Sequence, residues 1–274
     1  MLGQPLLGEK VRRAIAVTLL GSLAGLRAIN VSTSAGASTK APVLKILVTN
    51  DDGVSAPGID AAVQALRALP HTSVVVVAPL ANQSGTGGKT TPGTLTASKA
   101  TTASGYPATA IAGYPADTII WAITQHGVTT RPELVVSGMN FGENVGPLAD
   151  LSGTVGAARE AATLGIPAIA ASQGVDNGSA PNFSQGAAQL VKWVQQNRQA
   201  LIHKTLHVGR SVALNVPTCP TAPRGPVLAP IAASVTGINL GQVNCNVKSK
   251  KFPNDVQAFI NGYAVLSPLG HAPA

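Results

Sequence analysis

Lys45-Ile46-Leu47-Val48-Thr49-Asn50-Asp51-Asp52-Gly53 is the stretch that decides the fold, because an apolar run ends there in an amide, two adjacent carboxylates and a glycine. Residues 44–48 have no alternating polar face, which predicts a parallel strand covered on both sides. Ligands of open α/β sheets collect beyond the carboxyl ends of such strands. Asp51 and Asp52 would lie there, and two adjacent carboxylates are tolerated where a hard divalent cation takes their oxygens. Taken alone, the stretch fits a solvated Asp-Asp-Gly turn equally well.

Alternating helix and strand patterns follow this first strand. Residues 60–69 have helical spacing and end at Pro70, and the valine-rich run 73–78 is a second buried strand. A βαβ unit of this kind implies a parallel sheet. The same reading predicts later strands and helices at 133–136 (strand), 152–165 (helix), 166–171 (strand), 182–198 (helix) and 213–217 (strand). The sequence therefore predicts an α/β fold.

Composition limits the size of the core and the range of partners. The 274 residues are 45% apolar and only 3% aromatic, so a sizeable core must be built mostly from Ala, Val, Leu and Ile. The charge cluster Lys248-Ser249-Lys250-Lys251 has no interleaved aromatic residues and is interpreted as a solvated loop. We therefore expect no binding to a nucleic-acid polymer.

The N-terminus has the pattern of a secretory signal peptide over residues 1–37. Lys10, Arg12 and Arg13 form a basic segment, residues 14–26 are apolar, and Ala35-Gly36-Ala37 offers a cleavage site. The apolar run is too short for a stable membrane span. Cleavage would remove four basic residues and one acidic residue, which lowers the formal charge from +8 to +5. The prediction is export to the periplasm or the medium, with a cytoplasmic protein as the alternative if the leader is misassigned.

The two cysteines, Cys219 and Cys245, fall late in the chain in loop-like surroundings. In an exported protein such a pair most simply forms one disulfide, which stabilises by about 3 kcal/mol in the chain-entropy model. Two unpaired thiols are the alternative if the protein is not exported. No histidines lie nearby, so the pair makes a poor zinc site.

Three further segments bring polar groups to the predicted active edge. Ser84 follows the second strand, and Asn140 and Asn144 lie in a Gly/Asn-rich loop after the strand 133–136. Ser152 then begins a helix whose free backbone N–H groups and positive dipole end favour a phosphate. Each segment alone has a simpler interpretation, as a flexible connector, a plain loop and an ordinary N-cap respectively.

Gly88-Lys89-Thr90 resembles the end of a phosphate-binding P-loop, but the rest of that motif is missing. The motif requires a glycine five residues before Gly88, where this chain has Gln83. Residues 91–94 also resist the helix that should follow. A nucleoside triphosphatase of the P-loop class is therefore disfavoured.

Taken together, these motifs strongly resemble the SurE family of metal-dependent 5′/3′-nucleotidases and acid phosphatases. The residues that carry the resemblance occur in the right order over about residues 43–269: Thr49-Asn50-Asp51-Asp52-Gly53, Gln83-Ser84-Gly85, Ser137-Gly138-Met139-Asn140 with Asn144, and Ser152-Gly153-Thr154-Val155-Gly156. The resemblance implies a Rossmann-like three-layer catalytic core over 43–200, with a mainly parallel sheet. It also implies a smaller β-rich extension over 201–274 that exchanges between subunits of a homodimer or tetramer.

The resemblance also implies roles for individual residues. Asp51, Asp52, Ser84 and Asn140 would bind a divalent cation, Mn²⁺ or Mg²⁺, which suits ligands that are all oxygen. The phosphate pocket would be lined by Asn144, Ser152, Gly153 and Thr154. Asp51, Asp52 and Asn144 would act in catalysis.

The expected reaction is hydrolysis of nucleoside 5′- and 3′-monophosphates. The sequence leaves open whether a metal-bound hydroxide attacks or an aspartyl-phosphate forms. Two other functions stay open, namely a broad-specificity exported acid phosphatase and a phosphate- or nucleotide-binding module without turnover.

Overall fold

A computed structural model describes the chain in five segments, 41–125, 127–176, 180–206, 211–249 and 251–270. The described part from Ala41 onward forms one compact unit. The predicted signal peptide, residues 1–37, lies outside the described residues and stays a prediction.

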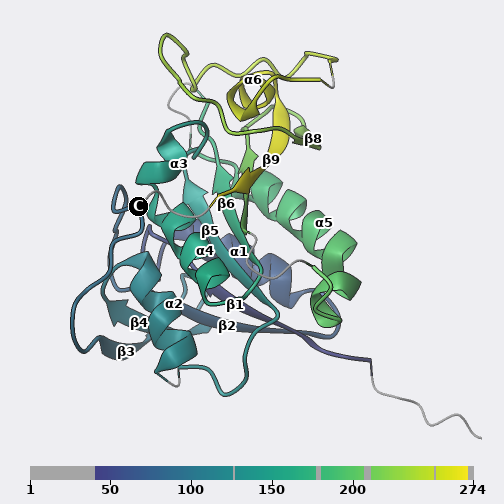
Figure 1. Cartoon of the computed structure of the whole chain (residues 1–274). Coiled ribbons are helices and arrows are strands. Elements are labelled where there is room, and N and C mark those ends of the chain that lie inside the picture. The colour runs from purple at the N-terminus through teal and green to yellow at the C-terminus, as the bar shows by residue number, and fades with distance from the viewer. Residues whose placement is uncertain (1–40, 126, 177–179, 207–210, 250, 271–274) are drawn as a thin grey trace, which may run out of the picture. The chain divides into compact units, whose positions relative to one another are not determined.

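One nine-stranded sheet forms the middle layer of this unit (Figure 1). Its strands lie in the order β3-β4-β2-β1-β5-β6-β7-β9-β8. Among the described strands, only β3 with β4 and β7 with β9 pair antiparallel. The neighbouring strands β4, β2, β1, β5, β6 and β7 are therefore parallel and end at one common edge. The strand bounds are β1 Leu44–Thr49, β2 Thr72–Pro79, β3 Thr96–Thr101, β4 Pro107–Ala112, β5 Leu134–Phe141, β6 Ala168–Gln173, β7 Ser211–Val216, β8 Arg224–Leu228 and β9 Tyr263–Leu269.

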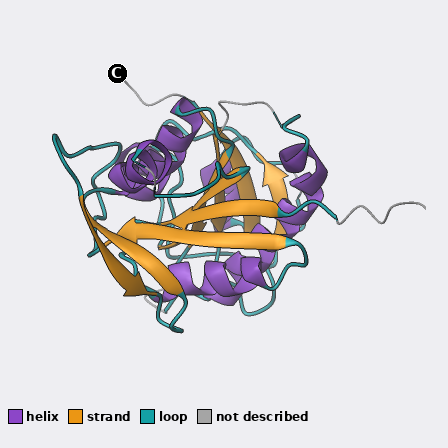
Figure 2. Ribbon diagram, turned by 90° about the horizontal axis from the view of Figure 1, so that it is seen from below, coloured by secondary structure: helices purple, strands orange, loops and turns teal. Residues whose placement is uncertain are grey.

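Helices cover both faces of the sheet, as the view in Figure 2 shows. α1 and α5 pack on one face, where Ile46 and Val48 of β1 point into a core shared with both helices. α2 and α4 pack on the other face around Leu47. The helix bounds are α1 Pro57–Arg67, α2 Pro115–Thr124, α3 Leu148–Leu151, α4 Gly153–Thr163, α5 Phe183–Ile202 and α6 Asp255–Ile260. This layered arrangement confirms the predicted α/β fold and the burial of the first strand on both faces.

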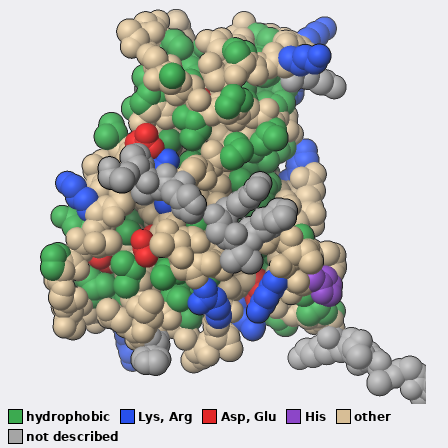
Figure 3. Space-filling view, viewed as in Figure 1, with side chains coloured by type: hydrophobic (Ala, Val, Ile, Leu, Met, Phe, Trp, Pro, Cys, Tyr) green, Lys and Arg blue, Asp and Glu red, His purple; other side chains and the backbone are tan. Residues whose placement is uncertain are grey.

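Among the described helices, none is long and apolar enough to cross a membrane. On the face that Figure 3 shows, hydrophobic side chains are spread among the polar ones, in keeping with a chain of which only 11% is charged.

The third predicted strand is longer than the sequence indicated. We expected it to end at Val136 and a loop to begin at Ser137, but β5 continues to Phe141. A register shift against β6 separates Ser137 from Asn140. Gly138 makes this possible because its φ is +131° and an added Cβ would lie 2.1 Å from the carbonyl oxygen of Ala171. Asn140 is therefore held by the sheet rather than by a loop.

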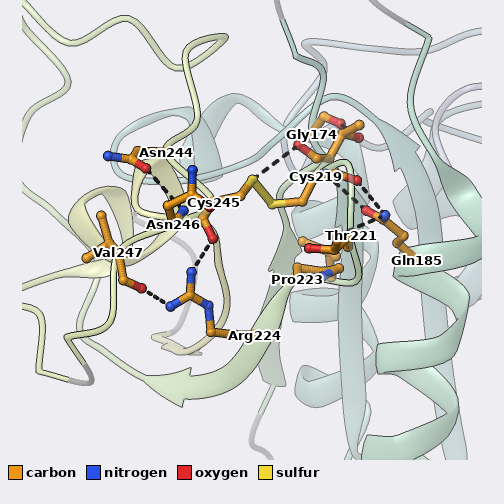
Figure 4. The surroundings of a disulfide bond; sticks show 12 residues. Gly174, Gln185, Cys219, Thr221, Pro223, Arg224, Asn244, Cys245, Asn246 and Val247 are labelled. Atoms are coloured by element: carbon orange, nitrogen blue, oxygen red, sulfur yellow. Dashed lines mark hydrogen bonds between the residues drawn. A yellow bond between two sulfur atoms is a disulfide. The ribbon is translucent and has the colours of Figure 1, made fainter.

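The C-terminal extension adds three strands to the same sheet and contains a disulfide, shown in Figure 4. Cys219, after β7, is bonded to Cys245, which precedes α6, with their Cα atoms 5.9 Å apart. This confirms the predicted pairing. Gln185 of α5 donates to the carbonyl oxygen of Cys219 over 2.7 Å and accepts from its N–H. Arg224 donates to the carbonyl oxygen of Cys245.

A separate small core lies between the extension and the loop that follows β5. Val145 of that loop packs against Val256, Phe259 and Tyr263. The buried carboxylate of Asp255 accepts the N–H of Gly146 over 2.9 Å and that of Ala232 over 2.8 Å. The extension therefore supports the loop on which Asn144 lies.

Candidate active site

Asp51 lies two residues beyond the end of β1 and is nearly fully buried, with 2% of its surface exposed. Thr154 at the start of α4 holds both of its carboxylate oxygens. The Thr154 hydroxyl donates to Oδ1 over 2.6 Å, and the backbone N–H of the same residue donates to Oδ2 over 3.1 Å. Burial raises the pKa of Asp51, and these two hydrogen bonds oppose the rise.

Glycine at the first position of α4 allows this close approach. A Cβ added to Gly153 would lie 2.9 Å from the Asp51 Cβ and 2.9 Å from Pro115 Cγ. The helix N-terminus therefore lies directly over the first carboxylate. Thr154 is fully buried and contacts Asp51, whereas Gly153 provides the space.

Asp52 lies on the other side of the end of β1. Its Oδ2 accepts the backbone N–H of Phe141, the last residue of β5, over 2.9 Å. Burial raises the pKa of Asp52 to about 6, and the neighbouring charge of Asp51 adds to the rise. Among the described residues, neither carboxylate forms an ion pair with a Lys, Arg or His. Two unneutralised carboxylates at one edge are a donor set for a cation.

Asn140 contributes a neutral oxygen beside the two carboxylates. Its side-chain nitrogen donates to the carbonyl oxygens of Phe141, over 3.2 Å, and Gly142, over 2.8 Å. These two acceptors fix the orientation of the amide, because both require a donor. The Asn140 Oδ1 accepts no hydrogen bond from the described residues and is available to a ligand.

Ser84 reaches the same edge from the loop after β2. Its backbone N–H donates to the Asn82 side chain over 2.9 Å, and the Gln83 N–H donates to the carbonyl oxygen of Asp51 over 2.7 Å. The loop is thereby tied to the end of β1, and the Ser84 hydroxyl is exposed. Of the four residues that the resemblance assigned to a cation, Asp51, Ser84 and Asn140 line one cavity, and Asp52 lines an adjoining hollow that shares Ser84.

A cavity of about 230 Å³ lies among these residues and the start of α4. Ser152 lines it and caps the helix by accepting the N–H of Val155 over 3.2 Å, which confirms the N-cap interpretation. The cavity is lined by Asp51, Ser84, Gly85, Asn140, Phe141, Glu143, Asn144, Leu148, Leu151 and Ser152. The N–H groups of Thr154 and Val155 already donate to Asp51 and to the Ser152 side chain, so an anion here would meet the positive dipole end of α4 and the Ser152 hydroxyl.

Asn144 lines this cavity and is held by residues that the sequence analysis missed. Its N–H donates to the Asn215 side chain over 2.7 Å, and the Asn215 amide donates back to the Asn144 carbonyl oxygen over 3.2 Å. The Asn144 side chain donates to the Ser172 hydroxyl over 3.0 Å. Asn215 and Ser172 are buried polar residues near the carboxyl ends of β7 and β6, a position that could have marked them.

Glu143 and Phe141 also line the cavity, and neither was predicted to belong to the site. The Glu143 Oε2 is buried and accepts no hydrogen bond from the described residues. Phe141 is 55% exposed although it ends a central strand. The sequence motif pointed to the neighbouring residues Asn140, Gly142 and Asn144, because Asn and Gly are the usual residues of a binding loop.

The residues present fit a hard divalent cation. The set offers two carboxylates, one hydroxyl and one amide oxygen, which is the oxygen-only chemistry that Mg²⁺ and Mn²⁺ prefer. No group of three His, Cys, Asp or Glu side chains gathers around one point in the described part of the chain. The two remaining ligands would therefore be the neutral oxygens of Ser84 and Asn140.

Comparisons with known proteins find relatives over about two thirds of the chain. The family model described as "Survival protein SurE" matches residues 46–242. The chain is 36% identical to a 5′/3′-nucleotidase SurE of Yersinia enterocolitica over 65% of this chain and 66% of that protein. It is 40% identical to a 5′-nucleotidase SurE 1 of Thermus thermophilus over 66% of this chain and 69% of that protein.

A solved structure has the same fold. The SurE protein from Aquifex aeolicus superposes with a TM-score of 0.65 at 27% identity, over 84% of this chain and 94% of that chain. The similarity in fold therefore extends over most of the chain.

Proposed function

Because the chain belongs to the SurE family, we propose that it is a phosphomonoesterase that hydrolyses nucleoside 5′- and 3′-monophosphates. The observation that carries the proposal is a pair of carboxylates that have no cationic partner among the described residues, next to a cavity at a helix N-terminus. A cation and an anion would each find complementary groups there, within one site.

The proposed ligands of the cation are Asp51, Asp52, Ser84 and Asn140. A divalent cation bound by them, Mn²⁺ or Mg²⁺, supplies Lewis-acid polarisation of a phosphoryl oxygen and lowers the pKa of a water. Thr154 keeps Asp51 in place by donating to both of its oxygens. The Phe141 N–H does the same for one oxygen of Asp52.

The phosphate is proposed to lie in the cavity at the start of α4. The Ser152 hydroxyl and the Asn144 amide donate to the phosphoryl oxygens, and the positive dipole end of α4 stabilises the negative charge that these oxygens carry in the transition state. Gly153 allows the start of α4 to lie close to Asp51, and Thr154 donates to the Asp51 carboxylate, so both residues act on the site through Asp51. Asn215 is a positioning residue, because it holds the backbone of Asn144 from both sides.

The water that attacks phosphorus needs a base, and Asp52 is the better placed of the two carboxylates. Both oxygens of Asp51 accept hydrogen bonds from Thr154, whereas the Asp52 Oδ1 accepts none from the described residues. Asp52 accepts the proton as the oxygen of the water bonds to phosphorus. The ester oxygen then leaves with its bonding electrons and takes the proton held by Asp52, which gives the nucleoside hydroxyl and returns Asp52 to its carboxylate form.

Phosphate release from AMP with added Mn²⁺ tests this function. Wild-type protein should turn over AMP, chelation with EDTA should stop turnover, and Asp51→Asn should lower the rate at least about a hundredfold. Asp60→Asn is the matched control, since Asp60 is an acidic residue of α1 away from the cavity. Equal rates for wild type and Asp51→Asn would refute the assignment.

Two other functions share the same cavity and predict different results. A broad-specificity acid phosphatase would hydrolyse p-nitrophenyl phosphate and polyphosphate as well as AMP. A binding module would be stabilised by phosphate or AMP against heat without releasing phosphate. Comparing rates on these three substrates with the thermal shifts distinguishes the three functions.

Export and self-association are also proposed. Fractionation of cells that express the full-length chain, with mass determination of its mature N-terminus, tests cleavage near Ala37. Light scattering after size exclusion tests the homodimer or tetramer. The edge strand β8, whose Leu228 is 76% exposed, is the surface we expect to be covered in the oligomer.

A further inference from the structure

A second, larger hollow adjoins the phosphate cavity. It measures about 460 Å³ and shares Ser84 and Phe141 with that cavity. Its other lining residues come from the end of β1, the loop after β2 and the starts of α1 and α5, namely Asp52, Ala56, Pro57, Gly58, Asn82 and Phe183. A ligand whose phosphate lies in the first cavity can therefore extend into the second without leaving the protein surface.

Two aromatic rings meet at this second hollow. The rings of Phe141 and Phe183 lie edge to face, with centroids 6.4 Å apart and planes at 65°. The whole chain has only four Phe, and Phe141 exposes 55% of its surface. An exposed ring next to a polar site is a suitable surface for a flat apolar group.

The floor of the hollow is built so that these rings can lie there. A Cβ added to Gly58 would lie 2.9 Å from Phe183 Cε1 and 2.0 Å from the carbonyl oxygen of Met139. Only glycine lets α1 pack this closely under the ring. Phe183 also packs against the main core, which restricts its motion.

The charges of the hollow select the kind of group that it can hold. No Lys or Arg of the described residues lines either cavity, and Asp52 is the only charged residue of the second. With Asp52 bound to the proposed divalent cation, additional phosphates in this hollow would find no Lys or Arg side chain to pair with. Asn82 and Ser84 offer polar groups that can pair with hydroxyls or with the edge of a base.

We propose that the second hollow binds the nucleoside part of the substrate, with the base against Phe141 and Phe183 and the ribose near Ser84 and Asn82. The inference rests on the proposed function and deepens it, because it names the residues that distinguish a nucleoside monophosphate from other phosphomonoesters. It also predicts that a chain of further phosphates is a poor occupant of this hollow.

Selectivity between two substrates is the test. The ratio of kcat/KM for AMP to that for glycerol 2-phosphate, which has no base, should fall about 5- to 100-fold in Phe183→Ala, since stacking of one base contributes about 1–3 kcal/mol. Phe183→Trp should keep the ratio because it keeps an aromatic face. Val43→Ala, an exposed apolar side chain just before β1, is the control and should keep the wild-type ratio.

Loss of activity by misfolding would lower both rates together, so the ratio is insensitive to it. Phe183→Leu keeps most of the packing and should still lower the ratio. An unchanged ratio in both Phe183→Ala and Phe183→Leu would overturn the inference.

A wild-type protein that hydrolyses neither substrate would refute the proposed function and leave the inference to a binding measurement. Calorimetry with adenosine on the wild type then decides: binding that weakens at least fivefold in Phe183→Ala supports the hollow as a nucleoside site. Equal binding in both proteins, or none to the wild type, overturns it.

Discussion

Replacing Asp52 by Asn should have opposite effects on stability with and without metal. Asp52 has a pKa of about 6 in the folded protein, against an ordinary value of 3.8. Because the folded-state pKa is raised, the folded protein holds the proton more tightly than the unfolded chain does. The charged form therefore costs stability, a cost absent below about pH 4 and fully present above about pH 6.

This rise of about two units in the pKa of Asp52 lowers the free energy of unfolding at neutral pH by at most about 3 kcal/mol. After allowance for the partial exposure of Asp52, we expect a loss of about 2 kcal/mol. Asn cannot ionise, and its side-chain oxygen can still accept the N–H of Phe141. Without metal at pH 8, Asp52→Asn should therefore unfold about 4–8 °C above the wild type, on the usual relation for a domain of this size. The advantage should shrink as the pH is lowered through 6 toward 4.

Saturating Mn²⁺ should reverse the order of the two proteins. A ligand at 100 times its Kd stabilises the folded state by about 2.7 kcal/mol. The wild type should gain the full stabilisation of about 2.7 kcal/mol from Mn²⁺. Asp52→Asn has lost one of the charged side chains proposed to bind the cation, so it should gain little. The assay is thermal unfolding from pH 4 to 8, with EDTA or with Mn²⁺.

Asp60→Asn is a control whose effect on stability should have the opposite sign to that of Asp52→Asn. Burial raises the pKa of Asp60, but hydrogen bonds from Ser104 and Thr102 outweigh it and leave the pKa lowered. This substitution should reduce stability above about pH 4 and leave the Mn²⁺ response intact. The reasoning fails if Asp52→Asn is less stable than wild type at pH 8 without metal, or if Mn²⁺ stabilises both proteins equally.

Three other substitutions test the surroundings of the site. Replacing Cys219 and Cys245 by Ser should cost about 3 kcal/mol of unfolding free energy, measured with denaturant, and a loss under about 1 kcal/mol would contradict a stabilising role for the disulfide. Asn215→Leu should lower the free energy of unfolding by about 2–3 kcal/mol and also lower kcat for AMP, because it leaves the N–H and the carbonyl oxygen of Asn144 unpaired. A variant with the wild-type kcat would contradict the positioning role of Asn215. Gly156→Ala should lower the free energy of unfolding by about 1–3 kcal/mol, because the new Cβ would lie 2.0 Å from a backbone carbonyl oxygen. This loss should outweigh the better helix propensity of Ala. Gly88→Ala is the control: its Cβ would meet open space, so the same unfolding assay should show almost no change.

The sequence by itself determined the fold class and the edge at which polar groups gather. Buried strands are short runs of apolar residues, and parallel strands end together, so Asp51 and Ser84 could be placed at one edge before any coordinates. Cys219 and Cys245 were paired by count alone. These conclusions depend on local pattern and on general rules of chain topology.

Only the tertiary structure decided what surrounds those residues. Asn215 lies 71 residues from the Asn144 backbone that it holds, and Asp255 lies 109 residues from Gly146. The continuation of β5 past Gly138 depended on the space beside Ala171, and the meeting of Phe141 with Phe183 depended on how α5 packs over α1. Such contacts are set by packing between distant segments, and no period or spacing along the chain records that packing.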